Sequence, residues 1–246
     1  MNDAHLYPYS VKEAKKRGEL ALWRESYSAN ISCKGAIEQA IRRNFNGMHL
    51  NPDCIKPVLA EFGYKRTAFV LANTIQELSY DGRLSPANRT WSNGIYVPPD
   101  KEHNPTFVVT SHPAVLDGFV DLYQKEYQAL GLFGGQHCEP NSYSQLDYEG
   151  KVLVLSADTL KESYWTPQSQ LWLAHDGFGC HPGAIGRSIR CTCLGDGETT
   201  RWNRREFVGV LKPEFLPSWA EQKLAELNGQ QQTSASAPTM GGMTMK

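Results

Sequence analysis

The sequence predicts an α+β protein in which a small N-terminal helical bundle precedes a module with a small, mainly antiparallel sheet and flanking helices. Apolar residues recur at helical spacing in the N-terminal part, whereas short β-type runs between turn residues follow it. A stretch rich in Pro and Asn separates the two patterns. We therefore expect a helical module over 6–92, a linker over 93–105, an α+β module over 106–228 and a disordered tail over 229–246.

The first helical stretch begins at a clear capping signal. Ser10 followed by Glu13 matches the capping box, in which two side chains satisfy free backbone N–H groups. Gly18 and Gly35 each weaken a helix, so we expect two helices here as readily as one. Asn30 lies within the apolar stripe and predicts a buried polar contact or a partial break. The stripe itself holds Trp23, Tyr27, Ile37, Ile41 and Phe45.

Three more helices complete the predicted bundle. The first starts at Asn51-Pro52, where Asn can cap and Pro suits the first turn, and Gly63 can end it in a left-handed conformation. The next carries apolar residues over 68–78 and ends at the Asp81-Gly82 turn. Ser85-Pro86 repeats the cap-and-proline signal and opens a short helix.

The second module reads as strands with two helices. Asp196-Gly197 is a strong hairpin signal between two of the strands. The predicted strands cover 107–109, 151–155, 171–174, 189–193 and 207–211, and the predicted helices cover 111–123 and 217–227.

Composition excludes several classes of protein. Hydrophobic residues make up 40% of the 246 residues and charged residues 21%, which suits a globular core. The net charge of −1 argues against a general electrostatic grip on nucleic acid or on an anionic membrane. No apolar run is long enough to span a bilayer, and the N-terminus lacks a signal-peptide pattern. We expect a cytoplasmic protein with reduced cysteines and no cofactor.

Cysteines and histidines of the second module suggest two candidate sites, a zinc site and a cysteine nucleophile with a histidine base. Potential zinc ligands are adjacent or alternate along a strand, a spacing that suits a tetrahedral site poorly, and buried core cysteines are the simpler interpretation. Cys180 beside His112 or His175 is a conceivable nucleophile and base, although the glycines around it are also typical of a plain turn. The potential metal ligands are His137, Cys138, His175, Cys180, His181, Cys191 and Cys193.

Arginines around the Asp196-Gly197 hairpin give the clearest binding hypothesis. If Cys191 and Cys193 face the core, Arg190 faces outward. Arginine with tryptophan suits a protein interface, and the same residues could instead contact phosphates and a stacked base. A solvated face with the tryptophan packed inward is the third interpretation. The candidate binding residues are Arg187, Arg190, Arg201, Trp202, Arg204 and Arg205.

Three segments together resemble one group of proteins. They are LYPYSVKEAKKRGELALWRESYSANISCKGAIEQAI, YKRTAFVLANTIQELSYDGRLSPANRTW and QLWLAHDGFGCHPGAIGRSIRCTCLGDGETTRWNRREFVGVL. The segments resemble uncharacterised proteins of a domain family of unknown function, carried by conjugative elements and prophages of gut Firmicutes. The resemblance spans most of the chain between residues 6 and 227 and assigns no catalytic residue.

The resemblance implies a biological setting. Related modules occur in large proteins of mobile elements that are thought to protect incoming DNA, and several small proteins of such elements inhibit CRISPR nucleases or restriction enzymes. It therefore implies a non-enzymatic counter-defence inhibitor that binds a host defence nuclease or its nucleic acid. A nucleic-acid-binding accessory protein for element transfer or replication is the alternative, and a cysteine- or metal-dependent enzyme is the second alternative.

Overall fold

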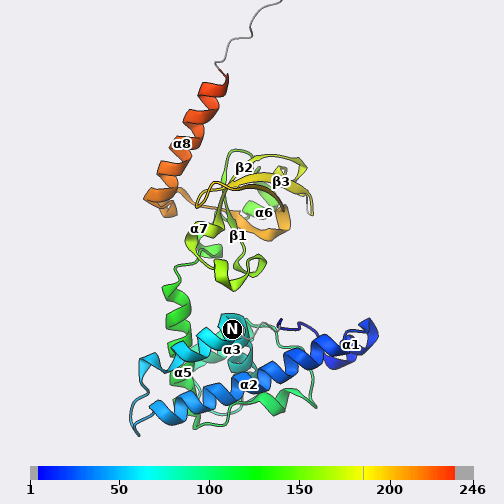
Figure 1. The fold of residues 1–246 in the computed structure, drawn as a ribbon, viewed down its shortest axis with the longest axis vertical. Helices are drawn as coiled ribbons and strands as arrows, with labels where there is room; N and C mark the ends of the chain where they lie inside the picture. The colour runs from blue at the N-terminus through cyan, green and yellow to red at the C-terminus, as the bar shows by residue number, and fades with distance from the viewer. Residues whose placement is uncertain (1–4, 185, 236–246) are drawn as a thin grey trace, which may run out of the picture. The chain divides into compact units, whose positions relative to one another are not determined.

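The computed structural model describes residues 5–184 and 186–235 of the chain. It divides into two compact units, Met1–Ala129 and Leu130–Lys246, which are described separately below (Figure 1). The first unit is helical, and the second holds a five-stranded sheet with flanking helices. The predicted α+β class is confirmed.

Five α-helices and two 3-10 turns form the described part of the first unit. The long helices α2, α3 and α5 enclose its core. The helices are α1 (Val11–Arg17), α2 (Leu20–Asn44), α3 (Lys56–Glu77), α4 (Pro86–Asn93) and α5 (Pro113–Ala129), and the 3-10 turns are η1 (Pro52–Ile55) and η2 (Asn104–Phe107).

Helix boundaries in this unit follow the capping residues. The Ser10 hydroxyl accepts from the Glu13 N–H at 3.4 Å, and Gly18 ends α1 with φ 71°. The helix α2 then passes Gly35 without a break, and its buried Asn30 accepts a hydrogen bond from the guanidinium of Arg66, the polar contact that the sequence predicted. The sequence predicted that a helix ends at Gly63, but the structure has a kink inside α3 there.

That kink lies at Gly63, which has φ 77° and ψ 174°. The predicted left-handed glycine is therefore present, but the chain resumes a helical course beyond it. The hydroxyl of Thr67 donates to the Gly63 carbonyl at 2.7 Å and supports the restart. Two helices that the sequence predicted separately consequently form one kinked element.

The first unit extends well beyond the predicted linker over 93–105. The division between the units falls after Ala129, because Phe107, Leu116 and Phe119 are fully or almost fully buried in the core that α2 and α3 build. The predicted strand over 107–109 is wrong. No strand lies beside it in the described part of this unit, and the Val109 N–H donates instead to the hydroxyl of Thr74 at 3.0 Å.

One antiparallel sheet organises the second unit, with strand order β4-β3-β2-β1-β5. The predicted turn at Asp196-Gly197 is present, with φ 82° at Gly197, but it joins β3 to β4, a strand over Thr199–Asn203 that the sequence did not predict. The predicted strands at 151–155, 171–174, 189–193 and 207–211 are confirmed within a residue or two. The strands are β1 (Val152–Leu155), β2 (Leu171–Asp176), β3 (Ser188–Cys193), β4 (Thr199–Asn203) and β5 (Phe207–Val210).

Short helices connect the strands, and one long helix follows them. The last strand leads through η8 to α8, which extends to Ala235 and thus into the predicted disordered tail. The rest of that predicted tail, 236–246, lies outside the described residues. The helical elements are η3 (Gly135–His137), α6 (Ser142–Gln145), η4 (Ala157–Thr159), η5 (Glu162–Tyr164), α7 (Pro167–Gln170), η6 (Phe178–Cys180), η7 (Arg204–Glu206), η8 (Pro213–Phe215) and α8 (Ser218–Ala235).

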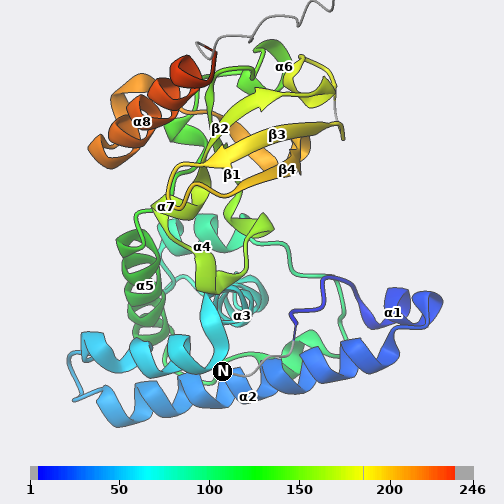
Figure 2. The same cartoon turned by 45° about the horizontal axis from the view of Figure 1, so that its top comes forward.

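The two faces of the sheet carry different cores. Trp172, Ile189 and Cys191 belong to a cluster on one face, together with the fully buried Tyr148. Val154, Leu171 and Leu173 belong to the other face, where Ala220 of α8 packs on them. The helix covers only part of that second face, so β3 and β4 keep an open polar surface there (Figure 2).

None of the described helices is long and apolar enough to cross a lipid bilayer.

Candidate binding surface

Strand register brings two of the predicted binding residues together. Arg190 of β3 is paired with Arg201 of β4, and Arg190 also faces Asp176 of β2. Residues that pair across antiparallel strands project from the same face. The three charged side chains therefore form a row across three strands on the face that α8 leaves open.

Asp176 neutralises part of this row. Its carboxylate accepts two hydrogen bonds from the Arg190 guanidinium, at 2.6 and 3.0 Å. The hydrogen bond to Arg190 lowers the pKa of Asp176, and the charge of Arg201 lowers it further. Arg190 is thus occupied by a carboxylate, whereas no salt bridge involves Arg201 among the described residues.

Two further predicted residues lie at the end of the sheet where β3 begins. Arg187 and Arg205 are exposed, and neither forms a salt bridge within the described part of the chain. Their backbones are close, because the Arg204 N–H donates to the Arg187 carbonyl at 3.0 Å. The structure thus places Arg190 and Arg201 together on the open face of β3 and β4, and Arg187 and Arg205 exposed at the end of these strands.

Arg204 is the exception, because it is fully buried. Its guanidinium donates to carbonyls on two separate loops and lies 3.6 Å above the centre of the Tyr148 ring. The accepting carbonyls belong to Ser142, Tyr143, Leu146, Gly179 and Cys180, at 2.7 to 3.2 Å. The predicted binding role of Arg204 is therefore corrected. It holds the interior of the second unit together.

Trp202 also faces inward, which corrects its predicted role as an exposed aromatic contact. It pairs with Ile189 on the core face, and its ring stands edge-on to Trp172 with centroids 5.6 Å apart. The indole N–H is buried without a hydrogen-bond partner among the described residues. Strand alternation explains the result, because placing Arg201 outward forces Trp202 to the opposite face.

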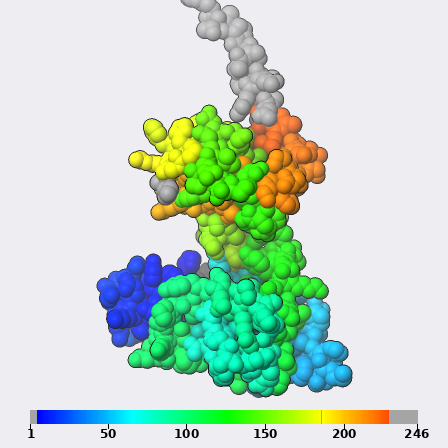
Figure 3. Space-filling view, turned by 180° about the vertical axis from the view of Figure 1, so that it is seen from behind, coloured from blue at the N-terminus to red at the C-terminus, as the bar shows by residue number. Residues whose placement is uncertain are grey.

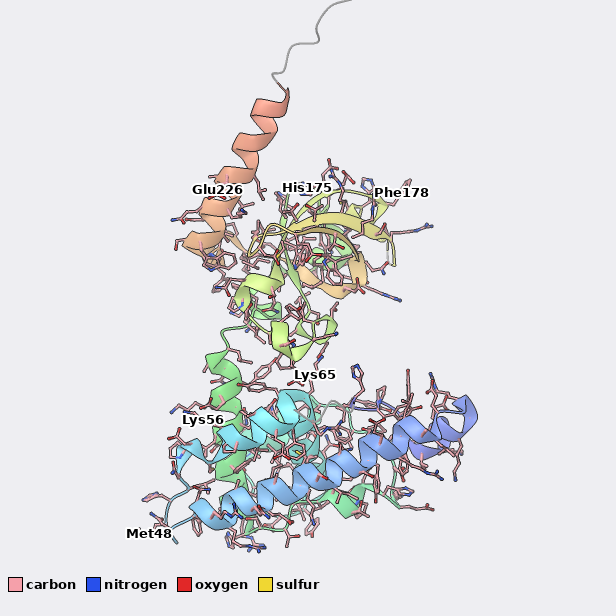
Figure 4. All side chains as sticks on the ribbon, viewed as in Figure 1. Met48, Lys56, Lys65, His175, Phe178 and Glu226 are labelled. Atoms are coloured by element: carbon pink, nitrogen blue, oxygen red, sulfur yellow. The ribbon has the colours of Figure 1, made fainter. Side chains whose placement is uncertain are left out.

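An aromatic side chain that the sequence analysis assigned to a plain turn takes the exposed position instead. Phe178 is 80% exposed in the loop between β2 and β3, and it lies at the outer edge of the second unit (Figure 4). The residues of this loop stand out from the surface in the space-filling view (Figure 3). An apolar ring between two glycines was the signal that could have identified it.

Glycine is required at both ends of Phe178. Gly177 has φ 122°, and a Cβ there would lie 2.5 Å from the Ser188 carbonyl oxygen. A Cβ on Gly179 would lie 2.4 Å from the Arg187 carbonyl oxygen. The loop therefore packs tightly against the start of β3, which holds Phe178 close to Arg187. We call Phe178, Arg187, Arg190, Arg201 and Arg205 the arginine surface.

Neutral side chains occupy the next row of the same face. The Nε2 of His175 lies 2.7 Å from the hydroxyl of Thr192, which lies 2.9 Å from the hydroxyl of Thr199. Burial lowers the pKa of His175, and the nearby Arg190 charge lowers it further. His175 is therefore neutral at neutral pH and adds no charge to the arginine surface.

The predicted alternative of a cysteine nucleophile finds little support in the geometry. All six cysteines are buried with free thiols, and burial is the first cause that raises the pKa of each. A thiol must ionise to act as a nucleophile, and burial disfavours that thiolate form in each of these residues. The pKa is raised to about 12 for Cys33 and Cys191 and to about 11 for Cys54, Cys138 and Cys180. The pKa of Cys193 is also raised above its ordinary value.

The potential metal ligands of the second module form no metal-binding group in the described structure. Among the described residues, no three His, Cys, Asp or Glu side chains form a group that could hold a metal ion. His181 lies 3.0 Å from Asp147, and His137 accepts from the Gly134 N–H, so these rings have other partners.

Residues 6–128 match the family described as Protein of unknown function (DUF3849). The match covers half of the chain. The chain belongs to this family. No curated protein and no solved structure matches it.

The DUF3849 match coincides with the first unit. It begins at Leu6 and ends one residue before Ala129, the last residue of that unit. The later of the three resembling segments begins at Gln170 and lies outside the residues that the family matches. The arginine surface therefore lies in the part of the chain that the family match does not cover.

Proposed function

We propose that this DUF3849 protein is a non-enzymatic binding protein of a mobile genetic element. In this proposal it acts in the cytoplasm as a counter-defence inhibitor of the anti-CRISPR or anti-restriction type. It occupies a host defence nuclease, or the nucleic acid of that nuclease, through the arginine surface. The setting comes from the resemblance to proteins of conjugative elements and prophages.

One observation carries the proposal. Arg187, Arg201 and Arg205 are exposed and free of salt bridges among the described residues, and the exposed Phe178 lies in the loop that packs against the backbone of Arg187. Exposed guanidinium groups beside an exposed aromatic ring are the side chains that most often dominate the binding energy of an interface. The backbone of these residues is held by the sheet and by the tight glycine loop, so binding requires ordering of the side chains alone.

A nucleic-acid-binding accessory protein for element transfer or replication is the second candidate. The favouring observation is the same Phe178 ring, since an exposed ring can stack on an unpaired base while arginines contact phosphates. Phosphate contacts make affinity fall steeply as salt rises. A gel-shift series against salt therefore separates the two candidates.

The test reverses the charge of the three free arginines. The variant Arg187→Glu/Arg201→Glu/Arg205→Glu should capture no specific partner from a host lysate, whereas the natural chain should. Arg204 is left intact because it is buried, and Arg190 because it is paired with Asp176. The thermal midpoint should stay within a few degrees, since exposed substitutions alter stability by about 0.5 kcal/mol or less.

A matched control carries the same change of charge elsewhere. Arg24, Arg42 and Arg43 are exposed on α2, so the triple Glu variant at these positions should retain the partner. Nuclease treatment of the lysate then identifies the partner as protein or nucleic acid. Equal loss of binding in both triple variants would mean that net charge, and not the arginine surface, is what the partner recognises.

A further inference from the structure

An aromatic pocket lies in the first unit, inside the segment that matches DUF3849. Its walls include the rings of Tyr7, Tyr9, Trp23, Tyr27, His103 and Phe107. They come from the N-terminal segment before α1, from α2 and from the stretch that ends in η2. Every residue that lines the pocket falls within 6–128, so the pocket belongs to the family domain and not to the unit with the arginine surface.

The rings are arranged with faces and edges in contact. Trp23 and Tyr27 are stacked with centroids 4.9 Å apart, and His103 stands edge-on to both, at 4.8 and 5.5 Å. The Tyr27 hydroxyl lies 2.6 Å from the hydroxyl of Thr106, which fixes that ring. The walls are therefore rigid, and their electron-rich ring faces attract a cation.

Asp100 is the one carboxylate among the described residues that line the pocket. Its side chain is 9% exposed. One oxygen lies 2.7 Å from the Nδ1 of His103, and the other accepts from the Val11 N–H at 3.3 Å. A carboxylate offers about four acceptor positions, so each oxygen retains room for another donor. The pocket thus combines ring faces with an unsaturated, mostly buried anion.

Neighbouring charges define the field around the pocket. The Tyr7 hydroxyl donates to the Glu19 carboxylate at 2.6 Å, which places a second anion beside one wall. The buried Arg66 lies behind the pocket, where it donates to the Ser26 carbonyl at 3.0 Å and to the amide oxygen of Asn30. Two acidic groups therefore lie at the pocket, and the guanidinium of Arg66 is bound to two of its lining residues, Ser26 and Asn30.

A cation already lies on one ring of the wall. The guanidinium carbon of Arg17 is 3.9 Å from the centre of the Tyr9 ring. This contact is made by the protein's own α1, and it leaves Trp23, Tyr27 and Asp100 to a ligand.

The size of the pocket and the acceptor capacity of Asp100 select among ligand heads. The volume of the pocket is about 30 Å³, and one water molecule needs roughly 10–15 Å³ of such space, so the pocket suits a small head group. A primary ammonium has three N–H donors, whereas a quaternary trimethylammonium head has none to donate to Asp100. An alcohol head would leave the charge of Asp100 uncompensated, and an anionic head would be repelled by it.

We propose that this pocket binds a primary alkylammonium group, held by the Asp100 carboxylate beside the stacked Trp23–Tyr27 ring pair. The group is the head of a small free amine or the end of a lysine side chain on a polypeptide. The site does not depend on the arginine surface or on the function proposed for it.

Nuclear magnetic resonance of the full chain tests the site at constant ionic strength. Titration with n-butylammonium should shift the Trp23 indole and the His103 ring resonances in a saturable way, with a dissociation constant on the order of millimolar. The neutral n-butanol, the anion butyrate and tetramethylammonium, which has no N–H donor, should bind at least about tenfold more weakly. Equal or tighter binding of any of these three overturns the proposal, whatever the variants show.

Variants then locate the site. Asp100→Asn should weaken n-butylammonium binding about tenfold or more, because a charge-assisted hydrogen bond is lost. Asp53→Asn removes an exposed charge elsewhere in the same unit and should leave the affinity unchanged. Trp23→Leu keeps the carboxylate and should also weaken binding, so the site is tested even if Asp100→Asn fails to fold. Unchanged affinity in Trp23→Leu would overturn the assignment of the site.

A second ligand distinguishes the two sources. N-acetyl-lysine methylamide carries the same ammonium group with a peptide backbone. Tighter binding of this compound than of n-butylammonium assigns the pocket to a lysine side chain, and equal binding assigns it to a small amine. Failure of both to bind overturns the proposal.

Discussion

At the scale of single residues, Arg204 and Arg205 show how neighbouring identical side chains take opposite roles. Both lie in the 3-10 turn η7, which begins where β4 ends. The turn directs Arg204 into the interior, where five carbonyl groups accept from it, and leaves Arg205 in solvent. A buried guanidinium with all its donors used organises the loops that accept from it.

We predict that Arg204→Ala lowers the free energy of unfolding of the second unit by about 3 kcal/mol or more. The change leaves several buried carbonyl groups without a donor, and each such group costs about 1–3 kcal/mol. Urea unfolding followed by circular dichroism measures the change. Arg205→Ala is the matched control, and it should stay within about 0.5 kcal/mol of the natural chain. Similar midpoints for both variants would contradict the structural role of Arg204.

At the scale of elements, the arginine surface depends on the register of three strands. The Asp196-Gly197 turn sets the pairing of β3 with β4, so Arg190 is opposite Arg201. An irregularity between Ala174 and Asp176 in β2 brings the carboxylate opposite Arg190. Without that irregularity, strand alternation would carry Asp176 to the other face of the sheet.

The Asp176–Arg190 pair gives the sheet a defined pH dependence. The folded pKa of Asp176 lies below its unfolded value, so the pair contributes stability above the unfolded pKa of the carboxyl group. That contribution is lost as pH falls through the lower folded pKa. Both side chains are about half exposed, so the contribution is small.

We predict that Arg190→Gln raises the pKa of Asp176 toward the ordinary range of an aspartate, because the hydrogen bond from Arg190 is its largest cause of lowering. Carbon-detected nuclear magnetic resonance of the Asp176 carboxyl group, titrated between pH 2 and 6, measures the midpoint. Arg205→Gln serves as the control, since Arg205 does not pair with Asp176, and it should leave the midpoint in place. An unchanged midpoint in Arg190→Gln would contradict the pairing.

At the scale of the whole molecule, the chain has separate cores in its two units. The first core draws on α2, α3 and α5, and its members end at Tyr127. The two clusters of the second unit begin at Phe133. A unit that holds its own hydrophobic core is expected to fold without its neighbour.

We predict that a fragment of residues 1–129 unfolds cooperatively in urea, whereas a fragment of residues 1–105 does not. The shorter fragment ends at the predicted linker and loses Phe107, Leu116, Phe119 and Val120, all of them buried in the first core. The free energy lost with these buried side chains is comparable to the whole stability of a typical domain. Circular dichroism and fluorescence compare the two fragments. Cooperative unfolding of 1–105 would restore the predicted domain boundary.

Local signals in the sequence determined most of the helix starts, the glycine turns and four of the five strands. Ser10, Ser85 and the Asp196-Gly197 pair act through bonds to residues only a few positions away, so their effects can be inferred without the fold. The α+β class follows for the same reason, since the period of apolar residues is a local property.

Only the tertiary structure decided which side chains remain free to bind. The sequence placed arginines near the hairpin, but burial of Arg204, inward packing of Trp202 and exposure of Phe178 depend on contacts with residues up to 62 positions away. The extension of the first unit through α5 likewise depends on distant partners in α2 and α3. Such contacts are set by the packing of whole elements, and no local pattern of residues encodes them.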